Sequence, residues 1–569
     1  MILDQEKSVL PLSHLFLSHG SIRFALTLAQ STPVTSIETE GLRNESKLLN
    51  KRSKVFAARA AIIASIGGLL FGYDIGVVEG ALPQLALDMH LSLGQQDAVV
   101  STMVIGALAG SVVAGYLTDR LGRWRAIVLT DLTFITGAAV LFAAQSPAAI
   151  LLGRFVVGMG VSVSAVADVS YLAEVAPKSL RGSMVSCNEL AISIGMLVSF
   201  LTGHLLREVQ GGWRYMFGLS ALLALLQLVL MLAFMPLSPR WLLTRRRREE
   251  ARHVLLKIRN NEVSRLASLK FLLQVLDSLG GDNVRVQQRF DTYNDRMTLS
   301  FSVLAVSQEE VNLEIREIEF IDRDTTGSLK ELFTEWGAPL AVTIILSVCQ
   351  QLIGQSNVLN FTQEILRRSH FRAKAPAVVL GVVKVVSTVI AIIYVDKVGR
   401  RPFLLWGAAA CTGSIFALAL AFLAEEPLLS FVACCALIAS YSVSFGPLTW
   451  LITAEMFPAG VRGKALGIGQ IGSYAGNLVA SAFFLRLLHV AGGFVTFFFF
   501  GSVAFLSTTF IFAAVPETRG KEPERIASEI PSCRSCLPYD AMPSDGRSGP
   551  VVACSSGMEH SVGSTAKWL

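Results

Sequence analysis

Twelve long apolar segments constrain this chain more than any other feature of its sequence. Each has about the 20 mostly apolar residues that a helix needs to cross a bilayer. They lie at 57–78, 97–117, 126–144, 149–172, 183–205, 213–235, 339–361, 376–395, 402–423, 428–452, 463–485 and 492–515. Because backbone in lipid must satisfy its own hydrogen bonds, such segments predict transmembrane helices. The expected fold class is an all-α membrane protein with twelve spans.

The apolar segments form two blocks of six, separated by a long polar stretch. We therefore expect an N-terminal tail (1–56), a first six-helix half (57–235), a central loop (236–338), a second six-helix half (339–515) and a C-terminal tail (516–569). Two charged runs in the central loop, Arg246–Leu279 and Gln308–Glu319, have the pattern of amphipathic helices. The tail beyond about residue 530 is rich in Ser, Pro and Gly, a composition that predicts disorder.

Lysine and arginine residues set the expected orientation of the spans. They gather in the loops after spans two, four, six, eight and ten, whereas most of the alternate loops are poor in them. One alternate loop, which carries Arg367, Arg368, Arg372 and Lys374, breaks this pattern. Because basic loops stay in the cytoplasm, the majority places both termini and the central loop there.

Composition excludes several classes of protein. Charged residues make up only 16% of the chain, whereas soluble domains carry about 25%. The basic residues lie in short runs between apolar segments and form no single face, so we expect no nucleic-acid partner. No phosphate loop, metal-ligand cluster or nucleophile–base arrangement occurs in a suitable context, so we expect neither an enzyme nor a bound cofactor or metal.

Two short motifs occur once in each half, at corresponding turns. Ala173-Glu174-x-x-Pro177-x-x-x-Arg181-Gly182 recurs as Ala454-Glu455-x-x-Pro458-x-x-x-Arg462-Gly463. Asp119-Arg120-x-Gly122-Arg123 recurs as Asp396-Lys397-x-Gly399-Arg400. The motif that begins with Ala-Glu follows the fourth helix of each half, and the motif that begins with Asp follows the second. Such an internal repeat is typical of transporters built from two related halves.

The charged residues of these repeats indicate a cytoplasmic gate. Acids and bases at matching turns can pair while the inner side is closed and separate when it opens. The expected gate residues are Asp119, Arg123, Glu174, Arg181, Asp396, Arg400, Glu455 and Arg462. The alternative is that the arginines only hold their loops inside. Topology does not require the acids, and their repetition therefore favours the gate.

At these motifs the chain resembles the sugar-porter branch of the major facilitator superfamily. Further matching motifs are Arg154-x-x-x-Gly158, Pro236-x-x-Pro239-Arg240, Gln350-Gln351-Leu352-x-Gly354, Gly446-Pro447-x-x-Trp450 and Pro516-Glu517-Thr518-Arg519-Gly520. The resemblance covers 57–525 except 260–305. Val382-Val383-Lys384-Val385 and Gly354-Gln355-x-Asn357 are most similar to the class III glucose transporters, types ten and twelve, although the loop after span nine is much shorter here. The resemblance implies the major facilitator fold and sugar transport by alternating access.

The resemblance also implies a sugar site near the bilayer midplane, between the two halves. Such a site needs amides and carboxylates for the sugar hydroxyls and an aromatic ring for the apolar face. Gln350 and Gln351 match the sugar-binding glutamines of the family, Trp450 matches its tenth-helix tryptophan and Asn477 its eleventh-helix asparagine. An interfacial anchor is the alternative role for Trp450.

Several positions depart from the better-known glucose carriers and make the expected site more ionisable. The departures are Glu189, Ser356 with Asn357 beside it, Lys384, Ser442 and Tyr474. All of these except Ser442 are included among the expected substrate-binding residues. Glu189 and Lys384 are either an ion pair between the halves or two charges solvated separately in the cavity.

Asp74 is the most informative single residue, because a carboxylate inside an apolar helix is costly without a role. Span one runs outward and span four inward, so Asp74 and Arg154 both fall in the outer half of the membrane. An aspartate balanced by an arginine can couple transport to proton binding. The context Phe71-Gly72-Tyr73-Asp74 is similar to proton-driven sugar symporters, and a static ion pair is the alternative. Asp168 departs from the family pattern and is expected to join the inner gate.

A stripe of glycines shares the first span with Asp74. Gly68, Gly72, Gly76 and Gly80 recur at every fourth residue and therefore lie on one face of a helix. Asp74 lies on a different face. The stripe predicts close packing against a neighbouring helix and not a ligand site.

The expected function is transport of a hexose, with D-glucose as the first candidate, by facilitation or by proton symport. The partners are then the sugar, protons and the lipid bilayer. One alternative is a proton symporter for an inositol-type polyol. Another is a nutrient sensor that does not transport, although the short C-terminal tail without motifs disfavours it. The plasma membrane is the expected location, with endomembranes as the alternative.

Overall fold

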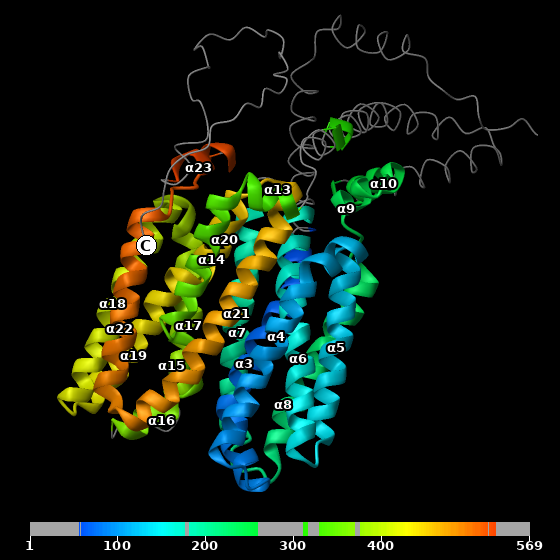
Figure 1. Ribbon diagram of the computed structural model, residues 1–569. Helices are drawn as coiled ribbons and strands as arrows, with labels where there is room; N and C mark the ends of the chain where they lie inside the picture. The colour runs from blue at the N-terminus through cyan, green and yellow to red at the C-terminus, as the bar shows by residue number, and fades with distance from the viewer. Residues whose placement is uncertain are drawn as a thin grey trace, which may run out of the picture.

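The fold is all-helical wherever the chain is described. The computed structural model describes residues 56, 58–176, 181–259, 311–313, 315–316, 329–369, 376–521 and 523–530. Within these residues twelve helices are long and apolar enough to cross a membrane. They stand side by side in two bundles, one formed by the first six spans and one by the last six (Figure 1). The expected all-α fold with twelve spans is therefore confirmed.

The first bundle follows the apolar segments of the N-terminal half. Its helices are α3 (Ile66–Asp88), α4 (Leu93–Leu121), α5 (Arg123–Ala143), α6 (Pro147–Val175), α7 (Arg181–Leu205) and α8 (Gly212–Phe234). The first span ends at Asp88, ten residues later than expected, and it accommodates Pro83. The hydroxyls of Ser92 and Ser146 accept backbone N–H bonds and thereby fix where α4 and α6 begin.

The second bundle contains two spans that are interrupted. Its helices are α14 (Gly337–Leu352), α15 (Gln355–Asn360), α16 (Thr362–Arg368), α17 (Pro376–Val398), α18 (Arg400–Leu423), α19 (Pro427–Val443), α20 (Phe445–Met456), α21 (Ala459–Val490) and α22 (Gly492–Ala514). Span seven breaks between α14 and α15, where Gly354 has φ +80°. Span ten breaks at Ser444, between α19 and α20. The apolar pattern predicted continuous helices here, because hydropathy carries no information on backbone conformation, such as the positive φ of Gly354.

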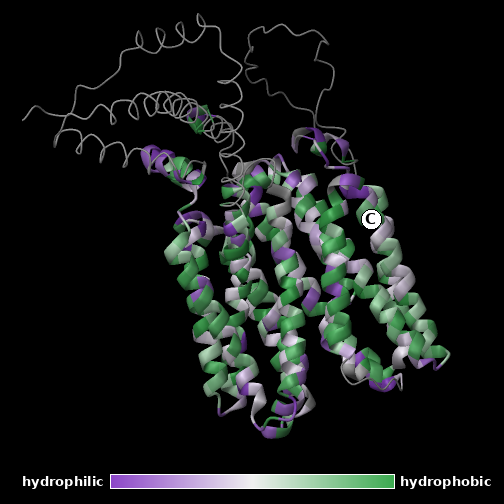
Figure 2. Ribbon diagram, turned by 180° about the vertical axis from the view of Figure 1, so that it is seen from behind, coloured by the Kyte–Doolittle hydropathy of each residue, from purple (hydrophilic) through white to green (hydrophobic). Residues whose placement is uncertain are grey.

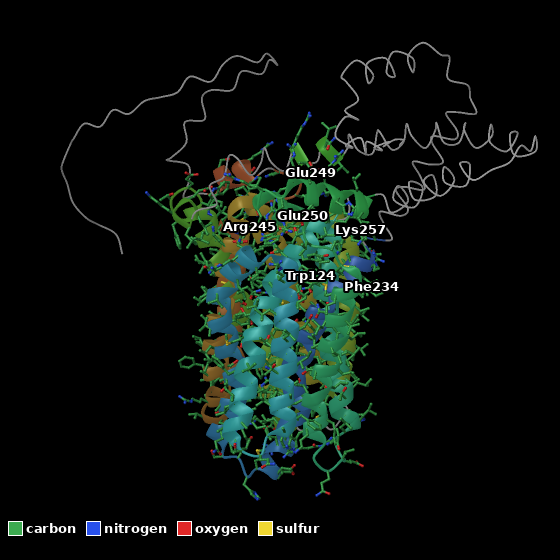
Figure 3. All side chains as sticks on the ribbon, turned by 90° about the vertical axis from the view of Figure 1, so that its right-hand side faces the viewer. Trp124, Phe234, Arg245, Glu249, Glu250 and Lys257 are labelled. Carbon is green, nitrogen blue, oxygen red and sulfur yellow. The ribbon has the colours of Figure 1, made fainter. Side chains whose placement is uncertain are left out.

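Short helices cluster at the end of the bundle that the sequence predicts to be cytoplasmic. They are α9 (Pro239–Thr244), α10 (Arg248–Arg259), α13 (Leu329–Thr334) and α23 (Pro523–Glu529), at the top of Figure 1. In Figure 3, Trp124 and Phe234 lie deeper in the bundle than Glu249 and Glu250 of α10. The first expected amphipathic run begins as α10. Its remainder, and most of the second run, lie outside the described residues.

The outer surface of the bundle is apolar along most of its length. Figure 2 shows hydrophobic residues along the helices and hydrophilic residues gathered at both ends. Large apolar side chains such as Leu226, Phe505 and Phe512 are exposed on this surface. In a soluble protein such exposure would promote aggregation, whereas in a bilayer these side chains face lipid tails.

Each bundle has its own apolar core, and two helices tie the cores together. Phe134 and Trp213 lie in the N-terminal core, and Phe484 and Phe497 lie in the C-terminal core. Helix α7 contributes Met196 and Phe200 to the C-terminal core, while α21 contributes Tyr474 to the N-terminal core. The halves therefore meet along α7 with α17 and along α4 with α21.

Candidate functional site

A network of polar side chains joins span seven to span eleven. The Gln351 Nε2 atom donates to the Ser473 hydroxyl at 2.9 Å, and the Asn477 Nδ2 atom donates to Gln351 Oε1 at 2.9 Å. The Ser356 hydroxyl donates more weakly to the same oxygen, at 3.4 Å. Three of the residues expected to bind substrate, Gln351, Ser356 and Asn477, are thus brought together on α14, α15 and α21.

Asn357 and Gln350 extend this network on either side of the break in span seven. The Ser481 hydroxyl lies 2.8 Å from Asn357 Oδ1 and 3.2 Å from Asn477 Oδ1, and its single proton can serve one of them at a time. Gln350 Nε2 donates to the Phe445 carbonyl at 3.0 Å, next to the break in span ten. The Gln350 Oε1 atom is buried without a partner. One amide acceptor is therefore available to a new donor.

Glu189 and Lys384 face each other across the boundary between the halves. They lie on α7 and α17, and their charges interact. Among the described residues, no ion pair within 4.0 Å includes either side chain. The Lys384 ammonium lies 5.9 Å from the centre of the Tyr441 ring instead. A hydrogen bond of 3.0 Å between Ser193 and Thr388 joins the same two helices.

The two aromatic residues expected at the site have different surroundings. Trp450 of α20 is half-buried, with its ring beside Gly469 of α21. Tyr474 is buried in the apolar core of the N-terminal half, and its hydroxyl has no hydrogen-bond partner. Tyr474 thus reaches from α21 into the opposite half, although the adjacent residue Ser473 contacts the amide network.

Asp74 and Arg154 meet in the interior of the N-terminal half. Both side chains are buried, and Arg154 Nη1 donates to the backbone carbonyl of Asp74 at 3.0 Å. The Arg154 Nε atom lies 3.4 Å from the Val99 carbonyl, and the guanidinium lies over the Phe217 ring. The charges of Asp74 and Arg154 interact, yet the Asp74 Oδ2 atom has no hydrogen-bond partner. The arginine is therefore held by backbone carbonyls, and one oxygen of the neighbouring carboxylate forms no hydrogen bond.

The expected gate residues of the N-terminal half form a compact cluster. Arg123 Nε lies 2.8 Å from Glu174 Oε1, and Arg123 Nη2 lies 3.2 Å from Asp119 Oδ1. The Ser238 hydroxyl donates to the second oxygen of Glu174. The side chain of Arg181 lies outside the described residues.

The C-terminal half repeats this cluster with small changes. Arg400 Nη2 lies 3.0 Å from Glu455 Oε1, and the Thr518 hydroxyl donates to the second oxygen of Glu455. Arg462 donates to the Phe457 carbonyl at 3.1 Å. The side chain of Asp396 lies outside the described residues. Both halves therefore present an arginine–glutamate pair that is secured by a hydroxyl.

Asp168 is not part of this gate, and the expectation that placed it there was wrong. Its side chain is buried between α6 and α3, where Oδ2 accepts a hydrogen bond from the Ser164 hydroxyl. Gly67 of α3 lies directly against the carboxylate, because its missing side chain leaves room there. The sequence placed Asp168 near the cytoplasmic end, but could not show that it faces inward.

A comparison with known families decides what kind of protein this is. The family model described as "Sugar (and other) transporter" matches residues 60–311 and 286–529. The chain belongs to this family. As a sugar transporter it is not an enzyme, and the resemblance recognised from the sequence motifs is confirmed. Relatives include the facilitated glucose transporter members 12 of Xenopus laevis and 10 of Danio rerio, each 27% identical.

Other relatives of this sugar transporter match over nearly their whole lengths. The glucose transporter GlcP of Staphylococcus epidermidis is 31% identical, over 82% of this chain and 96% of its own. The D-xylose-proton symporter-like 2 of Arabidopsis thaliana is 32% identical, over 88% and 96%. Among solved structures, the proton:xylose symporter XylE bound to 6-bromo-6-deoxy-D-glucose has a TM-score of 0.69 at 24% identity, covering 84% of this chain and 99% of that one. That likeness confirms the fold.

Sequence reasoning missed two hydroxyl residues that bind the glutamates of the expected gate clusters. Ser238 and Thr518 each lie two residues after a proline that follows the sixth helix of a half, Pro236 and Pro516. This shared spacing is a third motif that occurs once in each half, and it could have revealed both hydroxyls. It was missed because serine and threonine replace each other and the intervening residues differ.

Glu517 was recognised only as part of a family motif, and its structural role was missed because Leu237 holds the equivalent place in the N-terminal half. Its carboxylate accepts hydrogen bonds from the backbone N–H groups of Arg400 and Arg401 at the start of α18, and from that of Arg519. Burial disfavours its charge, but these N–H groups and that of Thr518 hold the pKa of Glu517 below its usual value. The glutamate therefore fastens the C-terminal tail to the first turn of α18.

Proposed function

We propose that this sugar transporter carries a hexose, with D-glucose as the first candidate, and couples its movement to a proton. The observation that carries the proposal is the buried carboxylate of Asp74. Its Oδ2 atom has no hydrogen-bond partner, while Arg154 is held against the Asp74 carbonyl. A carboxylate that is buried in a membrane protein is expensive, and it is usually part of a proton or ion pathway.

The amide network supports a neutral, hydroxyl-rich substrate. Gln351 and Asn477 offer donors and acceptors that can exchange partners with sugar hydroxyls, and Gln350 keeps an unused acceptor. The network bridges two pieces of span seven and span eleven, so a bound sugar would tie separate segments together. The named relatives agree with this substrate class, since one is a glucose transporter and another resembles D-xylose–proton symporters.

Contacts between the halves supply a route from sugar binding to Asp74. Helix α15 packs against α3, and Ile75, the residue after Asp74, packs against both cores. When span seven moves around a sugar, the surroundings of Asp74 change. A proton bound to Asp74 would remove its negative charge, while Arg154 would keep its bond to the carbonyl. The two protonation states can then favour different conformations.

Uptake of labelled glucose into proteoliposomes tests this proposal. We expect an inward proton gradient to drive accumulation by the wild-type chain and only equilibration by Asp74→Asn. Asp97→Asn is the matched control, because Asp97 is an exposed carboxylate on α4. Gln351→Ala should reduce uptake without reducing expression. Equilibration without accumulation by the wild type would make this a facilitative carrier, and no glucose movement at all would favour a polyol carrier or a sensor.

A further inference from the structure

Two buried aspartates on the cytoplasmic side of Asp74 have no part in the function proposed above. Asp131 of α5 and Asp168 of α6 are both 0% exposed. Neither carboxylate oxygen of Asp131 has a hydrogen-bond partner, and Asp168 has one partner, the Ser164 hydroxyl. The charge of Asp168 acts on Asp131. In the described part of the chain, no basic side chain forms an ion pair with either aspartate.

The two aspartates lie at similar depth in the membrane. Asp168 is seven residues before the end of α6 at Val175, which is about 10 Å along the helix. Asp131 is eight residues after the start of α5 at Arg123, which is about 12 Å. Both helix ends lie on the predicted cytoplasmic side. The pair therefore sits between that surface and the outer half, where Asp74 lies.

A third polar side chain without a partner lies within one helical turn of this level. Gln227 of α8 is buried, and neither its amide nitrogen nor its amide oxygen forms a hydrogen bond. Helices α5 and α8 are antiparallel, since Trp124 donates to the Met231 carbonyl at their inner ends. That register places Ala224 across from Asp131, and Gln227 three residues, or about 4.5 Å, nearer the predicted cytoplasmic end. Three side chains from α5, α6 and α8 thus leave hydrogen-bonding capacity unused in one buried layer.

The helix that carries Asp74 also touches this layer. A Cβ at Gly67 of α3 would overlap Asp168 Oδ2, so the α3 backbone lies directly on that carboxylate. Gly67 precedes Asp74 by seven residues, or about 10 Å along α3. One helix thus connects the coupling aspartate with the buried pair.

The other titratable groups on the surrounding helices do not neutralise the pair. They include Arg59 at the start of the first span, Asp74 on α3, Asp119 on α4, Arg123 on α5, Tyr171 and Glu174 on α6, and Glu189 on α7. Arg123 is engaged with Asp119 and Glu174, and the Arg59 guanidinium lies over the rings of Phe56 and Phe234. Two carboxylates that are buried together without a cation cannot both be ionised at reasonable cost.

We propose that Asp131 and Asp168 form a second proton-binding site, which receives the proton from Asp74 and passes it toward the cytoplasm. The transfer rests on the proton coupling proposed above, whereas proton binding by the pair does not. In the transfer, the O–H bond of the Asp74 carboxyl breaks and leaves a carboxylate beside Arg154. A new O–H bond forms on the Asp168 carboxylate. The total charge of the bundle is unchanged, and the second site later loses its proton to cytoplasmic water.

Infrared spectroscopy of the purified full-length chain tests proton binding directly. A protonated carboxyl group has a carbonyl stretch that a carboxylate lacks. We expect the double variant Asp131→Asn/Asp168→Asn to lose part of this signal at neutral pH, while Asp97→Asn loses none. Should the double variant fold poorly, Ser164→Ala is the second probe, since it removes the hydrogen bond to Asp168 and should shift the signal. A signal that neither variant alters would overturn the site.

Proteoliposome uptake then tests the transfer of the proton. An inward gradient of one pH unit can drive about tenfold accumulation at one proton per sugar. We expect wild type and Asp97→Asn to approach this ratio and the double variant to lose most of it. Accumulation at the wild-type level by the double variant would refute the transfer role. If the wild type does not accumulate sugar, proton coupling itself fails, and the infrared result alone still decides whether the pair binds a proton.

Discussion

The first and seventh spans occupy equivalent places in the two halves but are packed differently. In the N-terminal half a Cβ at Gly72 of α3 would overlap the Ile192 carbonyl of α7, so these helices touch backbone to backbone. In the C-terminal half a Cβ at Gly472 of α21 would lie 3.4 Å from the Ile344 carbonyl of α14, an ordinary contact. The glycine stripe of the first span therefore serves tight helix packing, as the sequence predicted.

The seventh span also differs because it is broken at Gly354, where α14 gives way to α15. Its link to span eleven runs through the side chains of Gln351 and Asn477, whose hydrogen bonds can change partners. The first span is instead a continuous helix that holds Asp74 in a fixed frame. The N-terminal half thus holds its buried charges on a continuous helix, whereas the C-terminal half joins a broken helix to span eleven through side chains.

Adding one methyl group to each packing surface tests this difference most strongly. Gly72→Ala should lower the free energy of unfolding by about 3 kcal/mol, because a backbone carbonyl blocks the new Cβ. Gly472→Ala is the matched change and should be nearly neutral, because the space exists and alanine favours a helix. Thermal unfolding of both variants in detergent measures the effect. Equal losses of stability in the two variants would show that the two halves are packed equally tightly at these positions.

The clusters of expected gate residues provide a second, smaller contrast. Arg123 pairs with Glu174, whose side chain is 9% exposed, in the N-terminal half, and Arg400 pairs with Glu455, whose side chain is 26% exposed, in the C-terminal half. A more buried carboxylate loses more when its counter-charge is removed. We expect Arg123→Ala to cost about 2 kcal/mol and Arg400→Ala about 1 kcal/mol. Melting temperatures at low and high salt measure both losses, and a larger loss for Arg400→Ala would contradict the ranking.

The break in span seven can be tested with two substitutions at one position. Gly354 has a left-handed backbone, which alanine adopts at a penalty of about 1 kcal/mol and asparagine adopts more easily. Gly354→Ala should therefore lower stability and slow glucose exchange, and Gly354→Asn should do so less. Unfolding and exchange assays on both variants separate backbone strain from the effect of a side chain near Phe500. Identical losses would mean that the side chain, and not the break, is responsible.

Periodicity and repeats predicted much of this molecule from sequence alone. The twelve spans followed because length and hydropathy are local properties, and the neighbourhood of Gln351 and Asn477 followed from the family resemblance. The break at Ser444 lies three residues before Pro447, so Gly446-Pro447 was a signal for it, because a proline disturbs the preceding helical turn. The sequence also indicated that Asp74 and Arg154 lie close together, but it did not indicate that Arg154 donates to the backbone carbonyl of Asp74. Which atom of a residue is contacted depends on rotamers, and a linear pattern does not contain them.

The smallest expected effect concerns acid sensitivity at the ends of the two halves that the sequence predicts to be cytoplasmic. The pKa of Glu517 is held low by backbone N–H groups, so its stabilising effect is complete above the ordinary glutamate pKa of 4.5 and is lost as pH falls through the lower folded-state value. Leu237 holds the equivalent place in the N-terminal half and contributes no such effect.

Glu517→Gln should remove the contribution, worth less than about 1 kcal/mol after solvent screening. Melting temperature as a function of pH measures it, with Leu237→Gln as the matched control. If Glu517→Gln melts with the same acid dependence as the wild type, the carboxylate does not fasten the tail to α18, and the two halves end alike.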